Sequence, residues 1–416
     1  MNEATLLYVR QHADDDVRQL ALRGSKDAAV DMAEALQQIA GRQMARKKLP
    51  SWAALDDILY PPHLNLEQCS SEPTAHYKAA IVKRLLAESS ESAEFSESAE
   101  FSEFSEFSEP SESFTLLDLT GGFGVDFSFM APLFNHAVYV ERQEELCQLA
   151  RHNFSVLGIR AEVVCADGTD YLHQLSHASV IFMDPARRDK HGSRTYGIAD
   201  CTPDVLQLRD ELLQKADLVV LKLSPMLDWR KTVNDLRAQW VKEVHIVAVG
   251  GECKELLIFL SKEGHQHLRV ICVNDDERFE VEEETEAVAT LPLPTSENYS
   301  FLYEPNASIM KAGCFSQLAR HYGVSPLAHN SHLFVSNKPV DNFPGRQFRV
   351  LAVSTMNKRE LKEKLGSLRQ ANITVRNFPL SVAELRKRLK LSEGGCHYIF
   401  ATTLANGNHV LIVCQR

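Results

Sequence analysis

The 416-residue sequence contains no apolar run close to the ~20 residues that a membrane-spanning helix needs. Residues 1–16 include no basic segment followed by an apolar one, so nothing indicates a secretory leader. The nine cysteines form no Cys-x-x-Cys pair and no Cys/His cluster with the spacing of a zinc site. We therefore expect a cytoplasmic protein with reduced thiols, no metal and no membrane partner.

The negative charge of the chain is unevenly distributed. The formal net charge is −11, yet residues 346–416 carry 13 Lys and Arg against four Glu. Residues 88–112 carry nine Glu and no basic residue. A nucleic acid senses local charge, so the acidic average does not exclude such a partner. The length is consistent with two or three domains.

Residues 88–112 form a low-complexity repeat in which glutamate recurs at every third position, from Glu88 to Glu112. A period of three fits neither a helix nor a strand, and like charges resist compaction. We predict a disordered acidic insertion. It serves either as a solvated spacer or as an arm that competes with nucleic acid for the basic C-terminal region.

The sequence on either side of this insertion predicts three folded regions. Residues 1–87 show helical periodicity, and Ser71 followed by Pro73 resembles the start of a helix. Residues 295–416 read as an α+β domain with two helices rich in Lys and Arg. Residues 113–294 alternate between short apolar strands and amphipathic helices, which predicts a mostly parallel, Rossmann-like sheet. Its seven expected strands are Phe114–Leu119, Ala137–Val140, Ala161–Cys165, Val180–Met183, Leu218–Leu223, Val244–Val249 and Leu268–Val273.

The first of these strands ends in a carboxylate and runs into the glycine-rich loop Asp118-Leu119-Thr120-Gly121-Gly122-Phe123-Gly124. A dinucleotide site would need a third glycine, but Phe127 stands at that position. A carboxylate at the strand end also suits a cationic ligand better than a pyrophosphate. S-adenosylmethionine carries an ammonium and a sulfonium, so Asp118 can attract its ammonium end while the glycines let the backbone approach.

The next two strands also end near acidic residues. Glu141 stands 17 residues after Gly124, close to the spacing of a residue that accepts both ribose hydroxyls. Asp167 follows the third strand and could accept from the exocyclic amine of adenine. The carboxyl ends of parallel strands share one edge of a sheet, so three acidic residues in register predict a donor site there.

Together these segments resemble the ordered motifs of class I S-adenosylmethionine-dependent methyltransferases over about 114–273. The stretch Glu67–Lys78 resembles the helix that closes over the methionine end of the donor in that family, which implies Ser71 and Thr74 as cofactor contacts. Three further segments resemble bacterial methyltransferases that carry a C-terminal THUMP-like domain. They are Tyr303-Glu304-Pro305-Asn306, Lys311-Ala312-Gly313 and Phe343-Pro344-Gly345-Arg346.

In this family the end of the fourth strand faces the methyl group, and here it reads Asp184-Pro185-Ala186-Arg187. Asp184 and the Pro185 carbonyl could orient an amine nitrogen toward the methyl group. The family pattern has a second proline and an aromatic residue where this chain has Ala186 and Arg187. Arg187 could stack on a base or hold a phosphate, or it could pair with nearby aspartates. No cysteine directly follows Pro185. Cys201 and Cys253 are within reach along the chain, but ordinary buried or loop thiols are the commoner interpretation, which disfavours C5 methylation of a pyrimidine.

The leading hypothesis is a methyltransferase that acts on a nitrogen of an RNA base, in rRNA or tRNA. Its expected phosphate contacts are the basic side chains of the C-terminal domain. They are Lys358, Arg359, Lys362, Lys364, Arg369, Arg386, Lys387, Arg388 and Lys390. The alternatives are a methyltransferase for a small molecule or a protein, and a binding module without catalytic activity.

Overall fold

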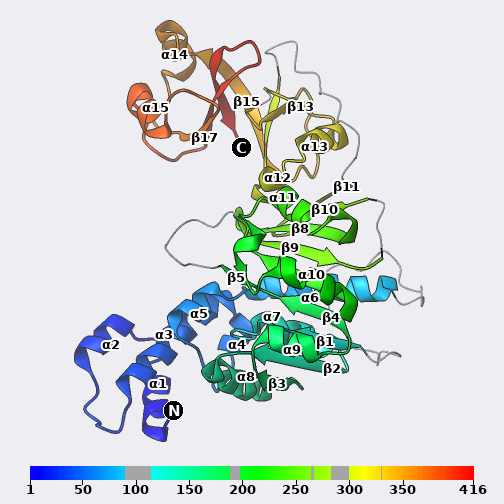
Figure 1. The fold of residues 1–416 in the computed structure, drawn as a ribbon. Helices are drawn as coiled ribbons and strands as arrows, with labels where there is room; N and C mark the ends of the chain where they lie inside the picture. The colour runs from blue at the N-terminus through cyan, green and yellow to red at the C-terminus, as the bar shows by residue number, and fades with distance from the viewer. Residues whose placement is uncertain (90–113, 188–196, 264–266, 283–298, 329) are drawn as a thin grey trace. The chain divides into compact units, whose positions relative to one another are not determined.

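The computed structural model describes residues 1–89, 114–187, 197–263, 267–282, 299–328 and 330–416 (Figure 1). The acidic repeat expected at 88–112 lies outside the described residues apart from its first two positions. The chain divides into two compact units. The first comprises residues 1–223, 230–241 and 258–264, and the second comprises residues 224–229, 242–257 and 265–416.

The first unit begins with the helical region that the sequence predicts. Asn2, Asp16 and Asp31 cap the first three helices by accepting hydrogen bonds from backbone N–H groups. Pro50 occupies the first position of the fourth, where its missing N–H costs nothing. The helices are α1 (Glu3–Gln11), α2 (Val17–Arg23), α3 (Met32–Lys48), α4 (Pro50–Ala53), α5 (His63–Gln68) and α6 (Glu72–Ser89).

Five parallel strands of the first unit follow the order β7-β4-β1-β2-β3. Their bounds are β1 (Thr115–Asp118), β2 (His136–Glu141), β3 (Glu162–Cys165), β4 (Ala178–Met183) and β7 (Ala216–Leu223). Strand β4 is buried along its whole length, as expected for a strand covered on both faces. The connecting helices are α7 (Val125–Met130), α8 (Glu144–Val156), α9 (Gly168–Gln174) and α10 (Val205–Lys215).

The sheet departs from the sequence prediction in its number of strands. All seven expected strands are present. The described residues contain two further strands of this sheet that were not predicted, β9 (Glu252–Leu260) and β11 (Glu277–Glu282). Strands β8 (Val241–Val249) and β9 contain residues of both units. In the second unit, β10 (Arg269–Asn274) pairs parallel with β8 and antiparallel with β11.

Short elements complete this part of the chain. Strands β5 (Ala186–Arg187) and β6 (Cys201–Thr202) pair with each other, and α11 (Trp229–Asp235) follows β7. Single 3₁₀ turns occur at η1 (Ala131–Leu133), η2 (Ile198–Asp200) and η3 (Ala238–Trp240). In the described residues no helix combines the length and the apolar character needed to cross a membrane.

The C-terminal part of the second unit is the α+β region that the sequence predicts. Its sheet has the order β13-β14-β12-β15-β18-β17-β16. The strands are β12 (Phe301–Pro305), β13 (Ser325–Pro326), β14 (Phe334–Ser336), β15 (Gly345–Thr355), β16 (Asn372–Arg376), β17 (His397–Thr403) and β18 (His409–Gln415). The helices are α12 (Ala307–Ala312), α13 (Phe315–Tyr322), α14 (Lys358–Leu365) and α15 (Val382–Leu389).

Helices α14 and α15 pack against one apolar cluster of this sheet. Leu365 and Leu385 are buried there with Ile399 and Leu411 of β17 and β18. The two helices carry seven of the Lys and Arg side chains that the sequence marks as basic, and most of these are exposed. Burial of one leucine-lined stripe thus presents positive charge on the opposite side of each helix.

Candidate active site

The loop after β1 is shaped by three glycines. Gly122 and Gly124 have φ of +58° and +81°, a left-handed conformation that other residues adopt at a cost. A Cβ on Gly121 would lie 2.2 Å from the ring of Tyr139 on β2. The hydroxyl of Tyr139 donates to the carbonyl of Gly122. The loop therefore lies directly on the Tyr139 ring, and only glycine fits at position 121.

Phe123, between these glycines, anchors the loop in the N-terminal helices. Its ring centroid lies 5.0 Å from that of Trp52 and 6.5 Å from that of Tyr60. Phe123, Trp52 and Tyr60 are buried in one apolar cluster with Leu49 and Ala75. The helical region is thus part of the scaffold that holds the glycine loop.

Two of the three acidic residues expected at the donor site meet this loop. Asp118 is the last residue of β1, and its Oδ1 accepts from the backbone N–H of Thr120 at 2.9 Å. Glu141 is the last residue of β2, and it accepts from the backbone N–H groups of Gly122 at 3.0 Å and Gln143 at 2.9 Å. Both side chains are buried.

Asp167, the third of these acidic residues, caps a helix. It precedes α9 and accepts from the backbone N–H of Thr169 at 2.8 Å. The following residue brings this turn close to β1, because a Cβ on Gly168 would lie 2.1 Å from the carbonyl oxygen of Leu119. All three loops therefore converge at the carboxyl edge of the parallel strands, although Asp167 is itself exposed.

Burial changes the protonation of Asp118. Removal from water raises the pKa of this carboxyl to about 8, and the nearby carboxyl groups of Asp126, Asp184 and Glu141 act in the same direction. The hydrogen bond from Thr120 opposes this rise and does not offset it. The carboxyl therefore holds a proton at neutral pH until a cation approaches.

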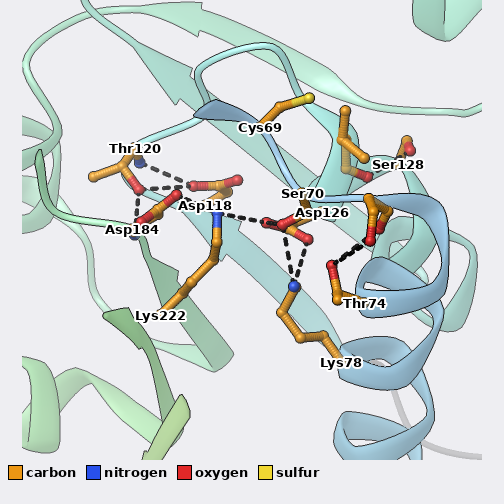
Figure 2. A network of polar contacts seen from close by, with 12 residues as sticks. Cys69, Ser70, Thr74, Lys78, Asp118, Thr120, Asp126, Ser128, Asp184 and Lys222 are labelled. Atoms are coloured by element: carbon orange, nitrogen blue, oxygen red, sulfur yellow. Dashed lines mark hydrogen bonds and ion pairs between the residues drawn. The ribbon is translucent and has the colours of Figure 1, made fainter. Parts of the chain in front are cut away.

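Thr120 joins the glycine loop to the loop after β4. Its hydroxyl accepts a 2.7 Å hydrogen bond from the backbone N–H of Asp184 and lies 3.5 Å from Oδ1 of Asp118 (Figure 2). One side chain thus touches the first residue of each loop that the sequence assigned to the donor and the acceptor. The separation of the two loops is fixed by the reach of a single threonine.

A row of alternating charges, which we call the charged row, runs from Asp184 into the protein (Figure 2). Nζ of Lys222, on β7, lies 2.5 Å from Oδ2 of Asp184 and 3.4 Å from Oδ2 of Asp126, on α7. Nζ of Lys78, on α6, lies 3.0 Å from Oδ1 of Asp126. Ser70 donates to Asp126 at 2.7 Å and accepts from Lys78 at 3.1 Å.

The two lysines determine the charge of Asp126. Burial alone would raise the pKa of this carboxyl, but the ammonium groups of Lys78 and Lys222 and the Ser70 hydroxyl hold it below its ordinary value. Asp126 is therefore an anion in the folded protein, in contrast to Asp118 on the neighbouring element.

Sequence reasoning did not assign roles to Ser70, Lys78 and Asp126. One signal for Lys78 was available, since it lies three residues after Ala75 and four before Val82, on the apolar stripe of its helix. A lysine on such a stripe must be buried with a partner. Asp126 gave a weaker signal, because an acidic residue in the first turn of a helix is common.

The remaining predicted site residues lie at the start of α6 and in the segment that follows β4. The hydroxyls of Ser71 and Thr74 lie 3.3 Å apart at the start of α6, and Thr74 also donates to the carbonyl of Ser71. Pro185 is buried directly after Asp184. The backbone of Arg187 belongs to β5, but its side chain lies outside the described residues.

The carboxyl edge of the parallel strands, with its glycine loop, fits S-adenosylmethionine better than a nucleotide. A Cβ on Gly122 would meet only the carbonyl of Thr120, at 3.6 Å, which leaves room for a ligand against the loop. The buried carboxyl of Asp118 can ionise when an ammonium pairs with it. A phosphate would instead face Asp118 and Glu141, both acidic and both buried, at close range.

Comparison with known proteins agrees with this geometry. A crystal structure of a methyltransferase candidate from Porphyromonas gingivalis W83 is 31% identical to this chain, with a TM-score of 0.82. The likeness covers 99% of this chain and 97% of that one. Proteins from two Mycobacterium tuberculosis strains, CDC 1551 / Oshkosh and ATCC 25618 / H37Rv, are each 25% identical over 279 residues. Both are described as uncharacterized S-adenosylmethionine-dependent methyltransferases, and the match spans 66% of this chain and 73% of theirs.

The chain belongs to this methyltransferase family. It is an S-adenosylmethionine-dependent methyltransferase, as the sequence resemblance implied. Residues 301–344 of the methyltransferase match a ferredoxin-like domain family, and residues 345–416 match the THUMP domain-like family. The predicted α/β fold with a C-terminal THUMP-like domain is thereby confirmed.

Proposed function

We propose that this methyltransferase modifies a nitrogen of an RNA base, in rRNA or tRNA. The supporting observation is the 2.7 Å hydrogen bond from the backbone N–H of Asp184 to the hydroxyl of Thr120. This bond holds the Asp184-Pro185 segment beside the glycine loop, because the Thr120 side chain connects the two. An acceptor amine held by Asp184 and by the Pro185 carbonyl would then lie beside the donor.

The donor side of the proposal uses the residues at the carboxyl edge of the sheet. Asp118 would pair with the ammonium of S-adenosylmethionine, Glu141 with its ribose hydroxyls and Asp167 with its adenine amine. Ser71 and Thr74 would contact the methionine end. The backbone of the glycine loop would form the surface on which the cofactor lies, through Thr120, Gly121, Gly122 and Gly124. When bound, the cofactor supplies an electrophilic methyl group on its sulfonium.

On the acceptor side, the protein would act mainly by orientation. A carboxylate and a carbonyl that each accept one N–H of an amine aim its lone pair at the methyl group. Such positioning can contribute several kcal/mol to lowering a barrier. Arg187 follows immediately on β5, and we propose that its guanidinium contacts the base or a phosphate of the substrate.

The RNA part of the proposal is supported by the THUMP-like domain. Its helices expose mainly positive charge to solvent, at Lys358, Arg359, Lys362, Lys364, Lys387 and Arg388. Phosphate contacts release counterions, so binding through these side chains should weaken steeply with salt.

The test is to incubate the full-length protein with labelled S-adenosylmethionine and total RNA from cells that lack it, and then to map the labelled nucleoside by mass spectrometry. We expect the label on a base nitrogen. Label on a ribose or a base carbon would contradict the nitrogen assignment. Label confined to protein or to small molecules would contradict the RNA assignment.

Asp184→Ala provides the matched variant for this assay. We expect its turnover to fall about 100-fold or more, because the acceptor loses its orienting carboxylate. Calorimetric affinity for S-adenosylmethionine should remain close to that of the unaltered protein. An unchanged rate would show that the acceptor binds elsewhere.

A further inference from the structure

We infer that Lys222 is a positioning residue that holds the carboxylate of Asp184 toward the acceptor, and that Asp126 and Lys78 hold Lys222 in turn. The inference rests on the proposed function, because it takes Asp184 as the group that binds the acceptor. It also defines the substrate class more closely. A carboxylate fixed as an anion selects an acceptor that presents a hydrogen-bond donor.

The first argument is the order of the charges. Lys78, Asp126, Lys222 and Asp184 alternate in sign along the charged row, with ion-pair distances of 3.0, 3.4 and 2.5 Å. Lys222 lies between two carboxylates, and its shorter distance is to Asp184. Attraction from both sides restricts the long lysine side chain to one position.

The second argument is the gradient of burial. The side chains of Lys78, Asp126 and Lys222 are 0%, 9% and 10% exposed, whereas that of Asp184 is 41% exposed. A substrate can therefore reach Asp184 and no other member of the charged row. The three buried members act through Asp184.

The third argument is the origin of each member. Lys78 lies on α6, Asp126 in the first turn of α7 and Lys222 near the end of β7. Asp184 lies in the short connection between β4 and β5. Regular elements thus support the one member that belongs to a loop. Pre-organised groups of this kind avoid reorganisation during the reaction.

Charge balance explains why the row needs more than one lysine. Asp184 faces Lys222 directly, and Asp126 and Lys78 are the next members of the charged row. Without Lys222, Asp184 would lose its partner ammonium at 2.5 Å and would keep the anionic Asp126 nearby. Its carboxyl would then bind a proton more readily and could no longer accept a hydrogen bond from the substrate through both oxygens.

The experiment compares Lys222→Met, which keeps the length of the side chain without its charge, with Lys222→Arg and with the unaltered protein. The first readout is a titration of the Asp184 carboxyl carbon by NMR in the full chain without cofactor, assigned with Asp184→Asn. We expect Lys222→Met to raise the midpoint by about 1–3 pH units and Lys222→Arg to leave it nearly unchanged.

The second readout is methylation of RNA. We expect Lys222→Met to lower kcat about 100-fold, to leave KM for RNA nearly unchanged, and to shift the acid limb of the kcat profile upward with the NMR midpoint. Lys222→Arg should recover most of the rate. Lys83→Met, at an exposed position on α6, is the control and should match the unaltered protein.

The two proposals fail in different ways. An unchanged NMR midpoint in Lys222→Met would overturn the inference, whatever the activity. A shifted midpoint with an unchanged kcat profile would also overturn it, because Asp184 would then not be held for catalysis. Absence of RNA methylation by the unaltered protein would overturn the proposed function, while the titration would still decide whether Lys222 holds Asp184.

Discussion

The charged row of the first unit and the basic helices of the second unit use charge in opposite ways. In the row, both signs alternate and three of four side chains are almost fully buried. On α14 and α15, positive side chains predominate and most of them are exposed. Buried charges of alternating sign fix geometry, because each is costly without its neighbours. Exposed charges that are mostly of one sign fix no geometry and attract an oppositely charged polymer from a distance.

Lys78→Met tests whether the buried charges of the row stabilise the fold, and it has the largest expected effect. Loss of the ammonium leaves Asp126 with one cation fewer inside the protein. We expect a loss of about 3–5 kcal/mol in the free energy of unfolding, measured by urea denaturation. Lys83→Met, on the exposed side of the same helix, should cost less than about 0.5 kcal/mol. Equal stabilities of the two variants would show that the row carries little energy.

Charge reversal on α15 tests whether the exposed basic side chains bind RNA. In the double variant Lys387→Glu and Arg388→Glu, RNA affinity at 0.1 M salt should fall about 100-fold, and the salt slope should shrink by about 1.5–2. Stability should barely change. Arg18→Glu with Arg23→Glu on α2 makes the same change in net charge. Equal losses of affinity in both double variants would trace RNA binding to overall charge instead of the THUMP-like domain.

A pH titration of cofactor binding tests the protonation of a further buried carboxyl group, that of Asp118. Asp118 has a pKa of about 8, so below that pH it must release its proton before it can pair with an ammonium. The nearby carboxyl groups of Asp126, Asp184 and Glu141 favour the protonated form. We expect affinity for S-adenosylmethionine to rise up to about tenfold per pH unit below pH 8 and then to level off.

Calorimetry in two buffers of different ionisation enthalpy measures this proton release directly. Asp118→Asn has no proton to release at this position and serves as the control. The difference in released protons between the unaltered protein and the variant should approach one at pH 7. No difference would place the ammonium away from Asp118.

The sequence predicted those parts of the site that local chemistry specifies. A strand that ends in Asp118 and enters a glycine loop permits few structures, and the ends of β2 and β3 follow from the same periodicity. Strand β9 was not predicted, because its first half is charged and it directly follows the Gly250-Gly251 turn. Strand β11 was not predicted either, since Glu and Arg fill most of its positions.

The charged row could not be predicted in the same way, because it depends on long-range packing. Lys78 and Lys222 are 144 positions apart, yet both contact Asp126. Their meeting depends on how α6 and α7 lie against the end of β7. The glutamate repeat and Arg187 show the reverse case, in which the sequence predicts a role and the described residues give no contact to test it. Composition and motif predict a role for them, and that role stays a prediction.

The Tyr139 ring beneath Gly121 has a bearing on the choice of methyl donor. The ring forms a rigid base under the glycine loop, so the depth available to a ligand is set by an aromatic side chain on the neighbouring strand. A smaller residue at position 139 would leave a hollow under the loop. Alteration of this fully buried position is therefore one route by which the enzyme could be adapted to bulkier sulfonium analogues.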